Sequence, residues 1–213
     1  MKRNLLLSDI DGTLTKKSLV LSHAGYLISK GLIKDDGSYK AWKQDVKNER
    51  LIVAVAENYR YQIIGMNEQQ LEAEKFMNQY LKESDKWYSM LDRIKSVIKA
   101  DNTTVYLVSG SSDFLVKHLA SYLGCEYIAT RYEKDENERY TGKIDGMFSA
   151  DQKDNAVQWN IDLANYNEVE AWGDTTSDLG LFKHASKRIL VDPTEETLKN
   201  LITVITVDEI IKK

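Results

Sequence analysis

A pair of carboxylates follows the first apolar run of the chain. The run Leu5-Leu6-Leu7 leads into Asp9-Ile10-Asp11-Gly12-Thr13-Leu14. An apolar run this short predicts a buried strand of a parallel sheet, and open sheets of this kind bind ligands at the carboxyl ends of their strands. If the backbone stays extended, Asp9 and Asp11 face the same crevice, because side chains alternate along a strand. The pattern favours an aspartate that acts as a nucleophile on phosphorus.

Gly12 permits a sharp turn after these carboxylates, and amides exposed by such a turn can hold phosphate oxygens. Two other interpretations compete with this one. Asp and Gly are also common in ordinary turns that end a strand. A calcium-binding EF-hand loop needs Gly at its sixth position and Glu at its twelfth. Counted from Asp9, these positions hold Leu14 and Val20, which excludes the EF-hand.

A second acidic cluster lies far along the chain. The strand-like run Glu168-Val169-Glu170-Ala171-Trp172 ends in Gly173-Asp174-Thr175-Thr176-Ser177-Asp178. Both clusters stand at the carboxyl end of a predicted strand, so they can converge on one divalent cation. Magnesium takes oxygen ligands and keeps several waters, so one or two carboxylates from each loop are sufficient to bind it.

Groups that can bind phosphate lie between the two clusters. The run Val105-Tyr106-Leu107-Val108 predicts another buried strand, which ends in Ser109-Gly110-Ser111-Ser112. Lys153 stands at the start of a predicted helix, for which Asp151 is the expected N-cap. A hydroxyl, exposed amides and an ammonium are the groups that a phosphoryl-transfer site needs.

These four segments, in this order, resemble the motifs of the haloacid dehalogenase superfamily of aspartate-nucleophile phosphohydrolases. More narrowly, the chain resembles the phosphoserine-phosphatase-like branch. In that branch a helical cap follows the first motif, a short hairpin like residues 129–144 precedes the lysine, and a strand like Ile189-Leu190-Val191-Asp192-Pro193 follows the fourth motif. The resemblance covers essentially the whole chain.

The resemblance also implies a role for each motif residue and a Mg²⁺ cofactor. Asp9 is the nucleophile, and Asp11 is the general acid and base. The implied phosphate-binding residues are Ser109, Gly110 and Lys153. The implied metal-binding residues are Asp9, Asp11 through its carbonyl oxygen, Asp174, and Asp178 as an additional or outer ligand.

The rest of the sequence predicts two regions. Between about residues 19 and 86 strand-like runs disappear, and apolar residues recur every fourth position, as in Leu51, Val55, Tyr59 and Ile63. Strands then alternate with helices to the end of the chain, beginning with a helix at residues 90–99. We expect an α/β fold, with a doubly wound, Rossmann-like parallel sheet core at residues 1–16 and 88–213 and a helical cap domain inserted at residues 17–87.

The composition is ordinary for a soluble globular protein. Of 213 residues, 42% are hydrophobic and 29% charged, and the net charge of −4 gives no support to nucleic-acid binding. The single cysteine, Cys125, cannot form an internal disulfide, and the first apolar run is too short for a signal peptide or a membrane span. We therefore expect a cytoplasmic protein with no nucleic-acid or membrane partner; the sequence does not specify its oligomeric state.

The residues together predict a Mg²⁺-dependent phosphomonoesterase that acts on a small phosphorylated metabolite through an aspartyl-phosphate intermediate. A phosphotransferase or mutase on the same fold and a noncatalytic phosphate-binding module remain as alternatives. A dehalogenase is disfavoured, because it has no use for the second aspartate of the first motif or for the cation.

Two departures from the resembled branch concern the substrate. Phosphoserine phosphatases carry an acidic residue just after the first motif, which receives the ammonium of the substrate, and the same offset here gives Ser18. Ser177 stands where their fourth motif commonly carries Asn. Both departures count against phosphoserine as the substrate. Ser18 and Arg60 are the candidate residues for substrate specificity.

Overall fold

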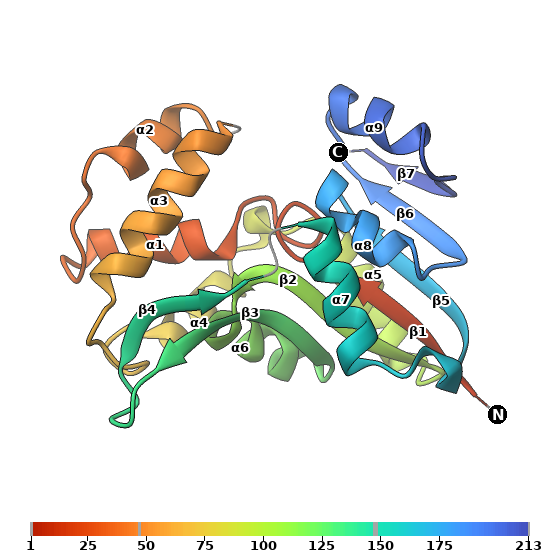
Figure 1. The fold of residues 1–213 in the computed structure, drawn as a ribbon, viewed down its shortest axis with the longest axis horizontal. Coiled ribbons are helices and arrows are strands. Elements are labelled where there is room, and N and C mark those ends of the chain that lie inside the picture. The colour runs from red at the N-terminus through yellow and green to blue at the C-terminus, as the bar shows by residue number, and fades with distance from the viewer. Residues whose placement is uncertain (1, 47, 147–148, 213) are drawn as a thin grey trace.

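The computed structural model describes residues 2–46, 48–146 and 149–212. Its strands form one seven-stranded sheet with the order β4-β3-β2-β1-β5-β6-β7 (Figure 1). The strands are β1 (Arg3–Ser8), β2 (Thr103–Ser112), β3 (Glu126–Lys134), β4 (Tyr140–Asp145), β5 (Tyr166–Gly173), β6 (Lys187–Val191) and β7 (Glu209–Ile211). Among these, only β4 pairs in the antiparallel sense, with β3. The order reverses on either side of β1, so the sheet is doubly wound as expected.

Helices cover both faces of the sheet, and the alternation of side chains along β1 shows how. Leu6 joins a hydrophobic cluster with α5 (Met90–Lys99) and α6 (Asp113–Leu123), whereas Leu5 and Leu7 join a second cluster with α7 (Ala150–Asn160), α8 (Leu179–Phe182) and α9 (Glu195–Ile202). All three leucines are buried, which accounts for the continuous apolar run in the sequence.

The chain between β1 and β2 is helical, as expected. Before α5, this part of the chain forms α1 (Leu19–Ser29), α2 (Ser38–Gln44), α3 (Glu49–Gln62) and α4 (Ala73–Tyr80), followed by the 3₁₀ turn η1 (Ser84–Lys86). Figure 1 shows α1 to α3 gathered on one side of the molecule, next to the β3–β4 hairpin. The predicted period is visible in α3, where Val55, Tyr59 and the following Ile63 are buried.

Two sets of backbone hydrogen bonds hold this helical segment, one between its two connections to the rest of the chain and one to β4. Where the chain leaves and re-enters the sheet region, the amide of Lys16 donates to the carbonyl of Lys86, and the amide of Tyr88 donates to that of Leu14, each at 2.9 Å. At the other end, Gly65 and Met66 hydrogen-bond to the backbone of Tyr140 in β4, also at 2.9 Å. The division into a core and a cap domain at residues 16/17 and 87/88 stays a prediction.

Two further 3₁₀ turns complete the elements, η2 (Leu163–Asn165) before β5 and η3 (Thr176–Asp178) after it. Within the described part of the chain, no helix is both long and apolar enough to cross a membrane.

Candidate active site

The loop after β1 is a tight turn that holds Asp9 beside the end of β5. The amide of Asp9 donates to the carbonyl of Trp172 at 3.0 Å, which extends the pairing of β1 with β5 by one residue. The carbonyl of Ile10 then accepts the amides of Leu14 and Thr15 at 2.8 and 2.9 Å. Asp9 is 4% exposed, so the turn carries a carboxylate into a largely buried position.

Gly12 is required in this turn for two reasons. Its φ of +91° lies in the left-handed region that side chains disfavour. In addition, a Cβ atom at this position would lie 2.1 Å from Oδ2 of Asp174. The glycine therefore lets the loop after β1 approach the loop after β5 closely.

The loop after β5 is organised by Asp178. Oδ2 of its buried carboxylate accepts the amides of Asp174 at 2.9 Å and Thr175 at 3.0 Å, so it folds the loop back on itself. A Cβ atom on Gly173 would lie 2.4 Å from that of Asp178, which explains the glycine at the end of β5. The Asp174 side chain thereby emerges at the end of the strand, next to the loop that carries Asp9.

Lys153 reaches the two acidic loops from the first turn of α7. Its Nζ lies 2.7 Å from Oδ1 of Asp9 and 2.6 Å from Oδ1 of Asp178, and the residue is 3% exposed. The predicted N-cap of this helix, Asp151, is wrong. Ser149 is the N-cap, because its hydroxyl accepts the amide of Gln152 while the Gln152 side chain accepts the amide of Ser149.

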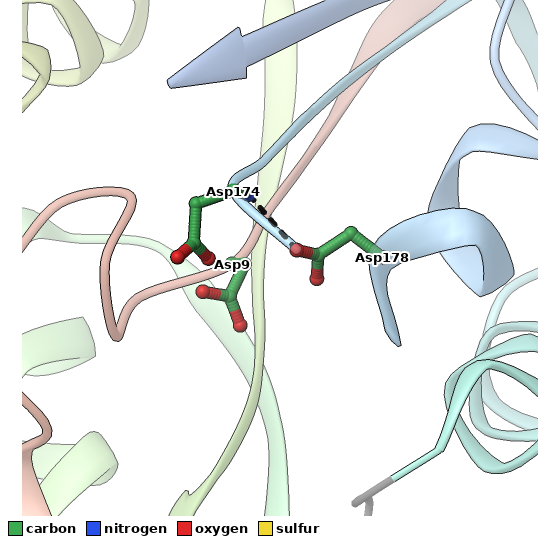
Figure 2. Close-up of side chains that lie close together, drawn as sticks. All are labelled: Asp9, Asp174 and Asp178. Carbon is green, nitrogen blue, oxygen red and sulfur yellow. Dashed lines mark hydrogen bonds between the residues drawn. The ribbon is translucent and has the colours of Figure 1, made fainter. Parts of the chain in front are cut away.

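Three carboxylates meet at this place. Oxygens of Asp9, Asp174 and Asp178 lie within 4.8 Å of one another, and Figure 2 shows the three side chains converging from the loops after β1 and β5. Burial raises the pKa of Asp9 to about 7, with a further rise from the charges of Asp178 and Asp11 and an opposing effect of Lys153. Burial, followed by the charges of Asp178 and Asp9, raises the pKa of Asp174 well above its ordinary value.

The pKa of Lys153 shows whether its side-chain amine is protonated. Burial alone lowers this pKa, but the charges of Asp178 and Asp9 outweigh that effect and raise it above its ordinary value. Lys153 is therefore a fixed positive charge. It balances the charge of one carboxylate of the cluster, and the remaining carboxyl groups repel one another in a mostly buried site, which contributes to the raised pKa values of Asp9 and Asp174.

This donor set fits a divalent cation of the magnesium type, which prefers carboxylate and carbonyl oxygens. Both oxygens of Asp178 already accept hydrogen bonds from Lys153 and from backbone amides. In contrast, Oδ2 of Asp9 and Oδ2 of Asp174 accept none from the described residues. Asp9 and Asp174 are therefore better placed than Asp178 to give an oxygen to a cation.

Asp11 is held separately from these three carboxylates. Its Oδ1 accepts the amide of Leu19, the first residue of α1, at 2.9 Å, and its Oδ2 accepts the hydroxyl of Ser111 at 2.5 Å. Burial raises the pKa of Asp11, and the hydrogen bonds from Ser111 and Leu19 oppose that rise. Asp11 is thus a carboxyl group with a raised pKa, two residues after Asp9.

Ser109 and Gly110 lie at the end of β2, the strand beside β1. The parallel register pairs Ser8 with Leu107, so the loop after β1 and the end of β2 lie at the same edge of the sheet. Ser109 is fully buried, and its Oγ accepts the amide of Ser111 at 3.1 Å. The carbonyl of Gly110 accepts the hydroxyl of Thr130 at 2.7 Å, which ties the end of β2 to β3.

The two candidate specificity residues have partners outside the acidic cluster. Ser18 is the N-cap of α1, and its hydroxyl accepts the amide of Leu21 at 3.4 Å. Arg60 donates to the carbonyl of Gly142 in β4 at 3.0 Å and pairs with Glu57 in its own helix. The sequence reasoning did not single out Ser111 or Thr13, whose hydroxyl lies 3.5 Å from Oδ1 of Asp174. In the sequence, Ser111 is one of three serines in the segment Ser109–Ser112, where nothing distinguishes one serine from another.

Comparison with known proteins identifies the family. The family model of haloacid dehalogenase-like hydrolases matches residues 6–183, which include both acidic loops and Lys153. A search of curated proteins gives no match.

Solved structures share the fold over the full length. A protein of unknown function from Bordetella pertussis Tohama I is 21% identical with a TM-score of 0.79, covering 100% of this chain and 99% of that one. A phosphoserine phosphatase in a substrate-bound complex is 17% identical with a TM-score of 0.69, covering 100% and 94%. A phospho-aspartyl intermediate analogue of phosphoserine phosphatase is 19% identical with a TM-score of 0.68, covering 100% and 95%. The family match spans most of the sequence and the fold agrees with it, so this chain belongs to the haloacid dehalogenase-like hydrolases.

Proposed function

We propose that this protein is a Mg²⁺-dependent phosphomonoesterase that acts on a small phosphorylated metabolite through an aspartyl-phosphate on Asp9. The observation that carries the proposal is the contact between Lys153 and Asp9, at 2.7 Å, inside a cluster of carboxylates at the ends of β1 and β5. A carboxylate that attacks a phosphate dianion must overcome charge repulsion. Lys153 and a bound cation reduce that repulsion at the same atoms.

Asp9 and Asp174 would hold the cation, together with the carbonyl oxygen of Asp11. Asp178 would act mainly by folding the loop and by holding Lys153, since both of its oxygens already accept hydrogen bonds. When bound, Mg²⁺ neutralises negative charge on the phosphoryl group and on Asp9.

The first chemical step transfers the phosphoryl group to the protein. An oxygen of Asp9 forms a bond to phosphorus while the bond between phosphorus and the leaving oxygen breaks. Asp11 in its acid form donates a proton to that leaving oxygen, which departs as an alcohol. The raised pKa of Asp11 favours the acid form that this step needs.

The second step releases phosphate. Asp11, now a carboxylate, takes a proton from a water molecule whose oxygen attacks phosphorus, and the bond between phosphorus and Asp9 breaks. The products are inorganic phosphate and the original Asp9 carboxylate, and Asp11 is again an acid. In both steps Lys153, Ser109 and the amide of Gly110 would stabilise the charge on the phosphoryl oxygens, each well-placed donor contributing about 3 kcal/mol.

The substrate is proposed only as a class. Two of the solved structures described above are of phosphoserine phosphatase, and one of them is a phospho-aspartyl intermediate analogue, which supports the proposed reaction type. Phosphoserine itself is disfavoured, because Ser18 stands where those enzymes carry an acidic residue and is occupied as the N-cap of α1. A specificity role for Ser18 and Arg60, and a cytoplasmic location, stay predictions.

The test is hydrolysis of p-nitrophenyl phosphate by the purified protein, with Mg²⁺ and with excess EDTA. We expect turnover that needs the metal and that Asp9→Asn reduces to a few per cent or less, because an amide is neither a nucleophile nor a good ligand. Asp151→Asn is the matched control. Its side chain lies in the same helix as Lys153 but is 89% exposed, so this variant should keep wild-type activity. Turnover by Asp9→Asn comparable to wild type would overturn the assignment of the nucleophile. A wild-type protein that binds phosphate without turnover would favour the noncatalytic module.

A further inference from the structure

The carboxyl group of Asp11 is held at both oxygens. One hydrogen bond comes from the backbone amide of Leu19 at 2.9 Å and the other from the hydroxyl of Ser111 at 2.5 Å. The first donor belongs to the first inserted helix and the second to the end of β2, so Asp11 is fixed between two separate parts of the fold. With only one of these bonds, the carboxyl group could rotate about its last side-chain bond.

Ser111 is built into the sheet rather than lying free on a loop. It is 1% exposed, so water does not compete for its hydroxyl, and its amide donates to Oγ of Ser109 at 3.1 Å. The hydrogen bond from the Ser111 amide to Ser109 holds the backbone of Ser111 in place. The Ser111 hydroxyl, carried on that backbone, then holds Oδ2 of Asp11. A hydroxyl can donate to a carboxylate and accept from a carboxylic acid, so this partner can remain bound during proton transfer.

We propose that Ser111 is the positioning residue that orients Oδ2 of Asp11 toward the leaving oxygen of the substrate. This inference rests on the proposed function, because it assigns Ser111 a part in the proton transfer described there. Ser111 acts through Asp11 and needs no contact with the substrate. A small error in the placement of a catalytic group is costly, about 100-fold in rate for a displacement near 1 Å.

The neighbouring residue provides a matched control. Ser112 is also fully buried at the end of β2, but its Oγ has no hydrogen-bond partner in the described part of the chain. Ser111→Ala and Ser112→Ala therefore remove the same atom from adjacent buried positions. Only Ser111→Ala removes a hydrogen bond to Asp11. Both variants keep the amide of residue 111, which can still donate to Oγ of Ser109.

The experiment compares kcat/KM for an alkyl phosphate and an aryl phosphate, because kcat/KM reports on the steps up to loss of the leaving group. An alkoxide needs a proton as it leaves, whereas a nitrophenolate needs little. We expect Ser111→Ala to lower kcat/KM for the alkyl ester by about 10- to 100-fold and for the aryl ester by less than about 3-fold. Ser112→Ala should stay within about 2-fold of wild type for both esters, since it breaks no hydrogen bond.

A double mutant separates positioning from a general structural effect. In the Asp11→Asn background the proton donor is absent, so adding Ser111→Ala should change kcat/KM for the alkyl ester by less than about 2-fold. The role of Ser111 would be overturned by equal losses of kcat/KM for the two esters, or by equal activity of Ser111→Ala and Ser112→Ala. It would also be overturned if Ser111→Ala lowered kcat/KM by the same factor in the Asp11→Asn background as in wild type. A wild-type protein that hydrolyses neither ester would instead overturn the proposed function and, with it, the role of Asp11.

Discussion

Oδ1 of Asp178 lies 2.6 Å from Nζ of Lys153, inside a site where both side chains are at most 4% exposed. The other oxygen of the same carboxylate accepts two backbone amides of its own loop. Asp178 therefore joins α7 to the loop after β5 and fixes Lys153 beside Asp9. Asp174 has no comparable set of hydrogen bonds, and burial among like charges raises its pKa well above the ordinary value.

This difference predicts opposite effects of two substitutions. Asp174→Ala should weaken Mg²⁺ binding at least about 10-fold, because it removes a ligand, yet leave the metal-free protein as stable as wild type or more so, because it removes a repelling charge. Asp178→Asn should destabilise the metal-free protein by about 3 kcal/mol, because it breaks the buried ion pair with Lys153. In addition, the NH₂ group of asparagine would have to face either Lys153 or the backbone amides of the loop, all of which are hydrogen-bond donors. Isothermal titration and urea unfolding measure the two quantities. Unchanged Mg²⁺ affinity in Asp174→Ala would require a metal site built from other residues.

The strands and their acidic ends could be predicted from the sequence because one local pattern encodes both. Leu5-Leu6-Leu7 is apolar at every position since both faces of β1 are covered, and the strand must end where the aspartates begin. The helix predicted at residues 90–99, ahead of the strand at Val105, has the predicted bounds. Lys153 is one of 29 Lys and Arg residues, so its residue type alone does not mark it as a site residue. Its place in the haloacid dehalogenase motifs identifies it as a candidate phosphate-binding residue.

Contacts between distant side chains could not be predicted in this way. Asp11 and Ser111 are 100 positions apart, and Ser111 and Ser112 are chemically identical in the sequence. Only the direction in which each side chain leaves the end of β2 decides which serine reaches Asp11. The N-cap of α7 was assigned wrongly for a related reason. Both Ser149 and Asp151 are good capping residues, and the reciprocal bond from Gln152 decides between them.

The close approach of Gly12 to Asp174 gives a second prediction. Gly12→Ala should lower Mg²⁺ affinity and kcat by about 10-fold or more, because the new methyl group would collide with Oδ2 of Asp174 in addition to straining the backbone. Gly37→Ala is the matched control. Its φ of +99° imposes similar strain, but no atom lies within 4 Å of the added Cβ. If both variants lost Mg²⁺ affinity equally, backbone strain rather than contact with Asp174 would be the cause.

A third prediction concerns stability and pH. His23 is fully buried, its Nε2 lies 2.8 Å from the carbonyl of Leu71, and its Nδ1 lies 3.0 Å from the hydroxyl of Tyr59. Burial lowers the pKa of His23 to about 4. Below its ordinary pKa of about 6.5, the unfolded chain binds a proton that the folded protein does not. The contribution of His23 to stability is therefore complete above about pH 6.5 and is lost as the pH falls toward 4.

Other buried groups also titrate in this range, so the comparison must be made with a variant. We expect the free energy of unfolding of wild type to exceed that of His23→Gln at pH 7.5, and the difference to shrink by up to about 3 kcal/mol on going to pH 4. Urea unfolding of both proteins across that range measures it. Parallel curves would mean that the pKa of His23 is the same in the folded and unfolded states.

The last prediction separates the roles of Asp11 and Asp9. Asp11→Asn keeps the size of the side chain and the backbone carbonyl, and it can still accept a hydrogen bond from Ser111 or Leu19, but it loses the proton donor and base. With an aryl phosphate the first step needs little protonation, so Asp9 should still be phosphorylated. Breakdown of the aspartyl-phosphate should then stall, because no group removes a proton from the attacking water.

The expected kinetics of Asp11→Asn are a burst of one nitrophenolate per active site, followed by turnover at least about 100-fold slower than wild type, within the range that general acid–base catalysis contributes. Reduction of the trapped acyl phosphate and mass spectrometry should locate the modification at Asp9. An alkyl phosphate should give no burst, since its leaving group depends on the missing proton. Equal impairment with both esters, and no modified Asp9 with either, would mean that Asp11 only positions the loop, and another group would have to be found for the proton transfers.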